Sequence, residues 1–138
     1  MADLTKIEVH INTSDIEDAG TDGSVYLGIC GREFRCDTSA DDFERGSNRT
    51  YIFGVSANVR NAASNDPRKP RLILEDVDRF PVYIRFEQDG GGGHWNLEMA
   101  TVHLNGTIFQ QYEIRLEREG LWLGKNSGAY IYLHKHID

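Results

Sequence analysis

Apolar and polar residues alternate one by one along much of this chain, and that pattern restricts it to β-structure. The stretch Lys6–Asn12 shows the alternation clearly, as expected of a strand with one buried face. No apolar repeat with helical spacing extends beyond about two turns. Further strands are predicted at 24–29, 33–36, 50–55, 82–87, 95–99, 100–104, 107–114 and 129–134. Because turn clusters rich in glycine and asparagine separate them, we predict an all-β antiparallel sandwich or barrel and favour two stacked sheets.

Length and composition fit one domain. At 138 residues the chain is long enough to bury a core without disulfide bonds. The polar stretch 56–70 is predicted to be a long surface loop, because too little chain lies on either side of it for two cores. We therefore predict a single domain over residues 1–138. Since Met1 opens the chain and the last predicted strand almost reaches Asp138, we expect a protein that stands alone.

The two cysteines are predicted to be free thiols. If Gly31 and Arg32 form a two-residue hairpin loop, Cys30 faces Glu33 and Cys36 lies on the far strand, so they are not cross-strand partners. Free thiols fit a reducing compartment. The chain start has no apolar signal-peptide region, and no apolar run is long enough to span a bilayer. We expect a soluble protein, with the cytoplasm slightly favoured over secretion and the compartment otherwise open.

The charge distribution argues against a nucleic-acid partner and for a bound cation. The formal net charge is −7, from 22 acidic and 15 basic residues, whereas a nucleic-acid binder shows a basic face. The acidic residues gather in the first half of the chain, at 15–18, Asp22, Asp37 and 41–42. Carboxylates this close repel one another unless a cation lies between them.

Three loops combine acidic residues with small ones, at 17–23, 37–43 and 88–93. Ca2+ takes six to eight oxygen ligands from carboxylates, backbone carbonyls and water, and such loops supply the first two kinds. In a sandwich these loops can meet at one end of the two sheets. The spacing does not match an EF-hand. From the residues alone, a calcium site and a set of solvated turns both remain open.

Several segments of the chain resemble a known family. The segment Ala19–Leu27 resembles the opening signature of PLAT domains, also called lipoxygenase-homology (LH2) domains. The match continues through 42–47 and 50–53 and resumes at 86–90, ahead of Trp95. The resemblance covers nearly the whole chain. It implies a sandwich of two four-stranded antiparallel sheets and a module that binds a lipid surface or a protein partner.

The loops are also similar, position by position, to the calcium-binding branch of this family found in clostridial phospholipase C toxins. That similarity implies Ca2+ as cofactor and several sets of ligands. The first set is Asp18, the Gly20 carbonyl, Asp89 and the Gly90 carbonyl. The second set is Asp37, the Ala40 carbonyl and Asp42, and a third is Thr21, Asp22, Asp41 and Asp42.

The membrane part of the resemblance is weaker at the third loop. The toxin branch places large apolar residues just before the acidic residue there, whereas this chain has Glu87 and Gln88. Ile16 and Trp122 are the remaining candidates for contact with a lipid or a partner, while Phe43 is expected in the core. We predict a calcium-binding module that docks to an anionic lipid or membrane surface. The alternative is a calcium-independent protein–protein interaction domain that uses a sheet face or edge.

The sequence offers little support for catalysis or for a zinc site. The chain has no Gly-x-Ser-x-Gly motif, and the glycine run 90–93 lacks the ending of a phosphate loop, so we predict that it is not an enzyme. His134 and His136 share one face of the last strand, but a zinc site needs further ligands and the sequence offers none nearby. A solvated strand end is therefore expected. The stretch 130–133 is predicted to be a central strand, apolar on both faces.

Overall fold

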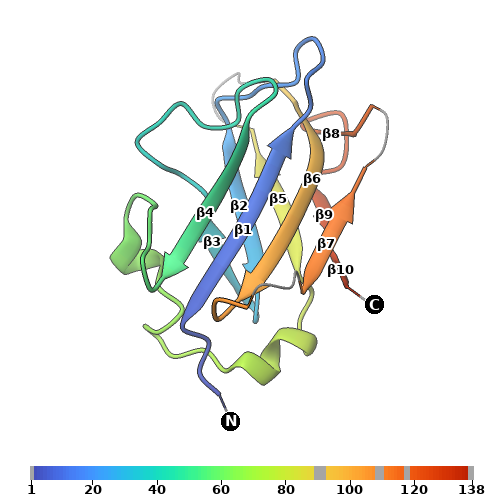
Figure 1. The fold of residues 1–138 in the computed structure, drawn as a ribbon. Coiled ribbons are helices and arrows are strands. Elements are labelled where there is room, and N and C mark those ends of the chain that lie inside the picture. The colour runs from blue at the N-terminus through green and yellow to red at the C-terminus, as the bar shows by residue number, and fades with distance from the viewer. Residues whose placement is uncertain (1, 89–92, 108–110, 117–118, 137–138) are drawn as a thin grey trace.

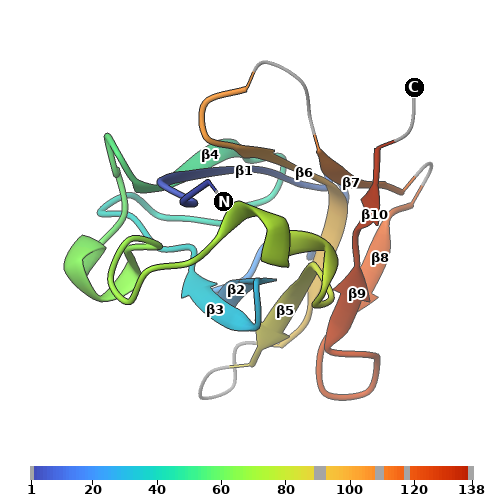
Figure 2. The same ribbon diagram turned by 90° about the horizontal axis from the view of Figure 1, so that it is seen from below.

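The computed structural model describes residues 2–88, 93–107, 111–116 and 119–136, which fold into two antiparallel β-sheets packed face to face (Figure 1). The six-stranded sheet has the order β10-β7-β6-β1-β4, with β8 also paired to β6. Its strands are β1 (Lys6–Thr13), β4 (Asn48–Gly54), β6 (Trp95–Leu104), β7 (Tyr112–Arg115), β8 (Leu121–Leu123) and β10 (His134–Lys135). The four-stranded sheet has the order β3-β2-β5-β9, from Arg32–Arg35, Ser24–Ile29, Tyr83–Glu87 and Tyr130–Tyr132. Figure 2 shows the two layers from below.

The predicted sandwich is confirmed, and one sheet is larger than the resemblance implied. The short strand β8 pairs with the start of β6, where Leu123 lies opposite Trp95. After β9 the chain changes sheets, and β10 pairs with β7. Both additions are short, which is why alternation did not reveal them as separate strands. The stretches predicted at 95–99 and 100–104 are one continuous strand, β6.

The connection from β4 to β5 contains two 3-10 helices, Ala62–Asn65 (η1) and Leu74–Asp78 (η2). The first lies within the stretch 56–70 that the sequence predicts as a loop. Figure 1 places both helices at the end of the sandwich where the N-terminus lies. Within the residues that the structure covers, no helix has the length and apolar character needed to cross a bilayer.

The alternating apolar residues form the core, and its aromatic part lies under one end of the sandwich. Trp95 is fully buried, and its ring centroid lies 5.4 Å from that of Phe43 and 5.9 Å from that of Phe86. The indole Nε1–H donates a hydrogen bond of 2.8 Å to Thr13 Oγ1. Phe43 is buried, as predicted, and also stacks on Tyr51. These rings form the floor beneath the loops that carry the predicted calcium ligands.

The hairpin between β2 and β3 differs from the prediction by one residue. Ile29 pairs with Arg32, so the two loop residues are Cys30 and Gly31 rather than Gly31 and Arg32. Both have positive φ, 55° and 75°, which a two-residue turn of the primed type requires. Cys30 therefore lies in the turn instead of opposite Glu33. Both cysteines are free, as predicted, and buried.

The prediction for β9 is wrong. This strand forms the edge of the four-stranded sheet, and Tyr130 and Tyr132 are 56% and 67% exposed. Ile131 between them is half-buried against the core. Tyrosine suits a solvent-facing strand as well as a buried one, so apolar character on both faces did not identify a central strand.

Candidate functional site

Backbone hydrogen bonds fix the loop between β1 and β2 against two other segments. The Asn96 N–H donates to the Ala19 carbonyl at 3.0 Å, and the Thr21 N–H donates to the Phe43 carbonyl, also at 3.0 Å. Ala19 is fully buried. A Cβ on Gly20 would lie 2.8 Å from the backbone nitrogen of Arg45, so this close approach requires glycine. We call the region made by 14–23, 36–47 and 93–94 the loop end; it lies at the top of Figure 1.

Asp42 shapes the second loop. Its carboxylate accepts hydrogen bonds from the Thr38 N–H at 2.7 Å, the Thr38 hydroxyl at 2.8 Å and the Tyr51 hydroxyl at 3.2 Å. The side chain is only 6% exposed, and Arg49 forms an ion pair with it at 3.9 Å. Asp42 therefore folds the loop inward, while its neighbour Asp41 remains exposed on the surface.

Three carboxylates meet at the loop end. Asp22, Asp41 and Glu44 each place an oxygen within 4.8 Å of the other two, and all three residues are exposed. The adjacent Asp41 raises the pKa of the Glu44 carboxyl above its ordinary value, first through a hydrogen bond to the protonated form and then through charge repulsion. A cation between the three would reverse that repulsion. Glu44 was not among the predicted ligands, and only its position beside the acidic pair 41–42 signalled it.

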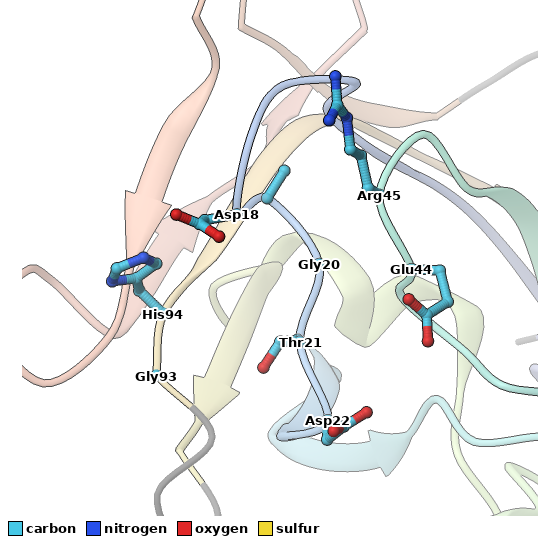
Figure 3. Close-up of a pocket in the computed structure, with 9 residues that line it drawn as sticks. Asp18, Gly20, Thr21, Asp22, Glu44, Arg45, Gly93 and His94 are labelled. Carbon is cyan, nitrogen blue, oxygen red and sulfur yellow. The ribbon is translucent and has the colours of Figure 1, made fainter.

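A groove of about 550 Å³ lies beside this cluster. Its lining includes Asp18, Gly20, Asp22 and Glu44, together with Arg45 and His94. In Figure 3 the Asp18 carboxylate points toward His94, and the Arg45 guanidinium points away from Glu44. Arg45 pairs with Asp15 at 3.0 Å. The groove thus has a carboxylate on each side, Asp18 beside His94 and Glu44 across from them on the same segment as Arg45.

The structure brings most of the predicted ligands to this end. Asp18, Gly20, Thr21 and Asp22 line the groove, and an adjacent hollow of about 140 Å³ is lined by residues that include Asp37, Ala40, Asp41 and Asp42. Thr21 and Asp22 line both spaces. Asp89 and Gly90 lie outside the described residues.

The two predicted contact residues are half-buried. Trp122 packs edge-on against the groove residue His94, with ring centroids 4.5 Å apart. The Ile16 carbonyl accepts a hydrogen bond of 3.2 Å from the Ala19 N–H. Both residues therefore lie next to the groove, and neither side chain projects fully into solvent.

Replacing Glu44 by glutamine is expected to have opposite effects with and without calcium. Because its pKa is raised in the folded chain, ionised Glu44 is unfavourable, and stability falls as pH rises from its ordinary pKa toward the raised one. At pH 7 in chelator, Glu44→Gln should increase the free energy of unfolding by less than about 0.5 kcal/mol and so raise Tm slightly. When Ca2+ is added, the Tm of the variant should rise by less than the Tm of the wild type. Thermal melts in both buffers test this, with Glu17→Gln as control; an unchanged response to Ca2+ would remove Glu44 from the site.

No protein-family model matches the chain. Among curated proteins, phospholipase C of Clostridium haemolyticum is 25% identical over 134 residues, which cover 93% of this chain and 29% of that protein. The chain therefore spans less than a third of this relative.

Solved structures are also similar to this chain, each over only part of its own length. The alpha-toxin of Clostridium absonum superposes with a TM-score of 0.67 at 25% identity, covering 96% of this chain and 32% of the toxin. The alpha-toxin from an avian strain of Clostridium perfringens gives 0.66 at 24% identity, covering 94% and 31%. Coral 8R-lipoxygenase, described as calcium-activated through a C2-like domain, gives 0.59 at 18% identity, covering 95% and 17%. The chain is therefore a β-sandwich similar in sequence and fold to part of the clostridial phospholipase C and alpha-toxin proteins, and similar in fold to part of the lipoxygenases.

Proposed function

We propose that this chain is a non-catalytic module that binds Ca2+ at its loop end and thereby docks to an anionic lipid surface. The observation that carries the proposal is the meeting of Asp22, Asp41 and Glu44 from two separate loops. Two further findings support a bound cation at this cluster. The surrounding residues supply the ligands that calcium takes, and the similar clostridial proteins share the fold.

The chemistry of the donors favours calcium over other metals. Asp22, Asp41 and Glu44 offer carboxylate oxygens only, and hard oxygen ligands suit Ca2+ or Mg2+ rather than Zn2+. The groove adds Asp18, the backbone of Gly20 and the Thr21 hydroxyl. A flexible set of loop carboxylates and carbonyls fits the variable coordination of calcium better than the strict octahedron of magnesium.

Calcium also removes the electrostatic obstacle to membrane docking. A chain with a formal net charge of −7 is repelled by an anionic membrane, and bound Ca2+ at the loop end reverses the local sign. Arg45 and His94 at the groove rim offer partners for a headgroup phosphate. The described large apolar residues that are exposed are Val55, Phe80 and the two β9 tyrosines, and none belongs to the loop end. The proposed contact is therefore to headgroups, without deep insertion.

A second candidate function is supported by the outer face of the four-stranded sheet. Tyr83 packs against Tyr130 and Tyr132, with ring centroids 5.3 Å and 6.4 Å apart. Arg85 lies 4.2 Å over the ring of Tyr26 and is paired with Glu33 at 2.8 Å. Tyrosine and arginine held in fixed positions are typical of protein-binding surfaces. Calcium-independent binding of a protein partner to this face is therefore the alternative.

Vesicle sedimentation separates the two candidates. With Ca2+, the chain should sediment with vesicles that contain phosphatidylserine and stay in the supernatant when a chelator is added or when the vesicles are purely phosphatidylcholine. Rising salt should weaken the binding, because the contact is electrostatic. Sedimentation equal to a protein-only control in every mixture would exclude lipid docking and leave the tyrosine face as the working site.

A further inference from the structure

Most arginine and lysine side chains of this chain pair with a carboxylate, and those without such a partner gather along one edge of the sandwich. Among the described arginines and lysines, those with no ion-pair partner are Arg32, Arg35, Arg60, Lys69 and Lys125. All but Lys125 lie on β3 or in the connection from β4 to β5. The strand β3 is the edge of the four-stranded sheet. Positive charge that the chain's own carboxylates leave unpaired is therefore concentrated at this edge.

Arg32 attaches the connection to β3. Its guanidinium donates hydrogen bonds to the Asp66 carbonyl at 2.8 Å and to the Ser64 carbonyl at 3.1 Å. The Lys69 N–H donates to the same Asp66 carbonyl at 3.0 Å, so the backbone of Lys69 lies close to the Arg32 guanidinium. In Figure 2 the η1 coil lies on the β3 and β4 side of the sandwich, away from β9.

Asn65 fixes the other end of the connection. Its Oδ1 accepts a hydrogen bond of 3.0 Å from the Arg35 N–H, and its Nδ2 donates to the Asn61 carbonyl at 3.1 Å. Arg60, which precedes Asn61, donates its N–H to the Asp37 carbonyl at 2.8 Å. Arg35 and Arg60 therefore lie where the connection adjoins the loop end.

Four exposed basic residues belong to this side of the molecule, and we call Arg35, Arg60, Arg68 and Lys69 the basic edge. Arg68 pairs with Asp66 at 2.9 Å. Residues 58–71 contain four basic residues and one acidic residue, whereas the whole chain has a net charge of −7. Because salt at physiological concentration screens exposed charges beyond about 8 Å, the nearby cations decide how an anion interacts with this edge.

We propose that the basic edge binds a sulfated polysaccharide. A guanidinium donates two parallel hydrogen bonds to an oxyanion, and an ammonium attracts it as a compact charge. Sulfate groups repeat along such a polysaccharide, which suits cations spread along a strand and the segment beside it. The side chains of Arg60 and Lys69 make no hydrogen bond or ion pair among the described residues, so both are available for sulfate.

The residues at this edge favour a polysaccharide over a protein or a nucleic acid. The exposed large apolar residues that the structure describes are Val55, Phe80, Tyr130 and Tyr132, and none belongs to β3 or to 56–71. Protein interfaces depend on a few buried anchors, often aromatic, and single-stranded nucleic acids stack their bases on aromatic side chains. A sulfated polysaccharide requires mainly the cations, which this edge has.

Titration of a fluorescently labelled heparin octasaccharide with the full chain, followed by anisotropy in chelator, tests the proposal. Chelator prevents Ca2+ from bridging the loop end to sulfate, so this result is independent of the proposed calcium-dependent docking. The octasaccharide should bind, and rising salt should weaken the binding, because each contacted cation displaces a counterion. A desulfated octasaccharide, a single-stranded oligonucleotide and phosphatidylserine vesicles in chelator should all bind more weakly.

Arg60→Gln/Lys69→Gln should weaken heparin binding by about 25-fold, from about 5-fold for each cation, and should lower the salt slope by about 2. Lys125→Gln/Lys135→Gln is the matched control, because it removes the same charge on the side of β9 and β10. The control should stay close to the wild type. Thermal melts verify that both variants are folded.

Three results would overturn the proposal. The first is no binding of the octasaccharide by the wild type, and the second is equal affinity in the wild type and in Arg60→Gln/Lys69→Gln. An equal loss in both double variants would show a general effect of charge. Tighter binding of the desulfated sugar, the oligonucleotide or the vesicles would also contradict the assignment to a sulfated polysaccharide.

Discussion

Calcium is expected to raise the Tm of this chain by about 10 °C when its concentration is about 100 times the Kd. Binding to the folded state alone contributes about 2.7 kcal/mol at that ratio, and for a chain of this size each kcal/mol raises Tm by about 3–5 °C. The Asp22→Asn/Asp41→Asn variant should lose nearly all of the shift, because it removes two of the three clustered carboxylates. Differential scanning calorimetry in Ca2+ and in chelator measures both.

A matched double variant separates this loss from a general effect of charge. Asp3→Asn/Asp76→Asn changes the net charge equally, at residues whose partners are Arg71 and Arg79. Neither belongs to the loop end. This control should keep the full calcium shift. If both double variants keep it, the ion binds elsewhere; if both lose it, the effect is not specific to the cluster.

Replacing Trp95 by alanine is expected to cost about 3–5 kcal/mol of unfolding free energy, since a fully buried indole leaves a large cavity. The substitution also removes the ring that packs against Phe43 and Phe86 and the hydrogen bond to Thr13. Because Phe43 and the neighbouring Asn96 hold the first loop through their backbones, the variant should also bind calcium more weakly. Urea unfolding and a calcium titration of the remaining folded protein measure the two effects.

Trp95→Phe is the control for packing. It keeps an aromatic ring in the cluster and loses the indole N–H, so Thr13 Oγ1 loses its donor. We expect a cost of about 1–2 kcal/mol, close to that of one buried hydrogen bond plus the smaller ring. A cost below about 1 kcal/mol for Trp95→Ala would contradict the role given to this floor of rings.

The sequence predicted the sandwich because alternation is strong where one face is buried, as in Ile7, Val9 and Ile11 of β1. The sequence prediction failed where the backbone conformation of a turn or the position of a strand in its sheet determines the structure. The hairpin turn placed positive φ at Cys30 and Gly31, and a pattern of residue types alone did not favour cysteine there. Tyr130 and Tyr132 have the same character in a central strand as on an exposed edge, so β9 was placed wrongly.

The candidate site was predictable in location but not in detail. The loops with acidic residues indicated the end of the sandwich at which Asp22, Asp41 and Glu44 meet, whereas the position of Glu44 in that cluster depends on how the second loop folds around Asp42. No spacing rule specifies that Asp42 turns inward while Asp41 stays exposed.

Calcium-dependent binding of the wild type and of Asp22→Asn/Asp41→Asn to phosphatidylserine vesicles, measured side by side, is the most direct test of the proposed docking. The wild type should sediment with vesicles in Ca2+ and be released by chelator, while the variant should remain in the supernatant in both buffers. Equal sedimentation of the two proteins in Ca2+ would contradict the proposal that these carboxylates hold the ion through which the loop end contacts lipid.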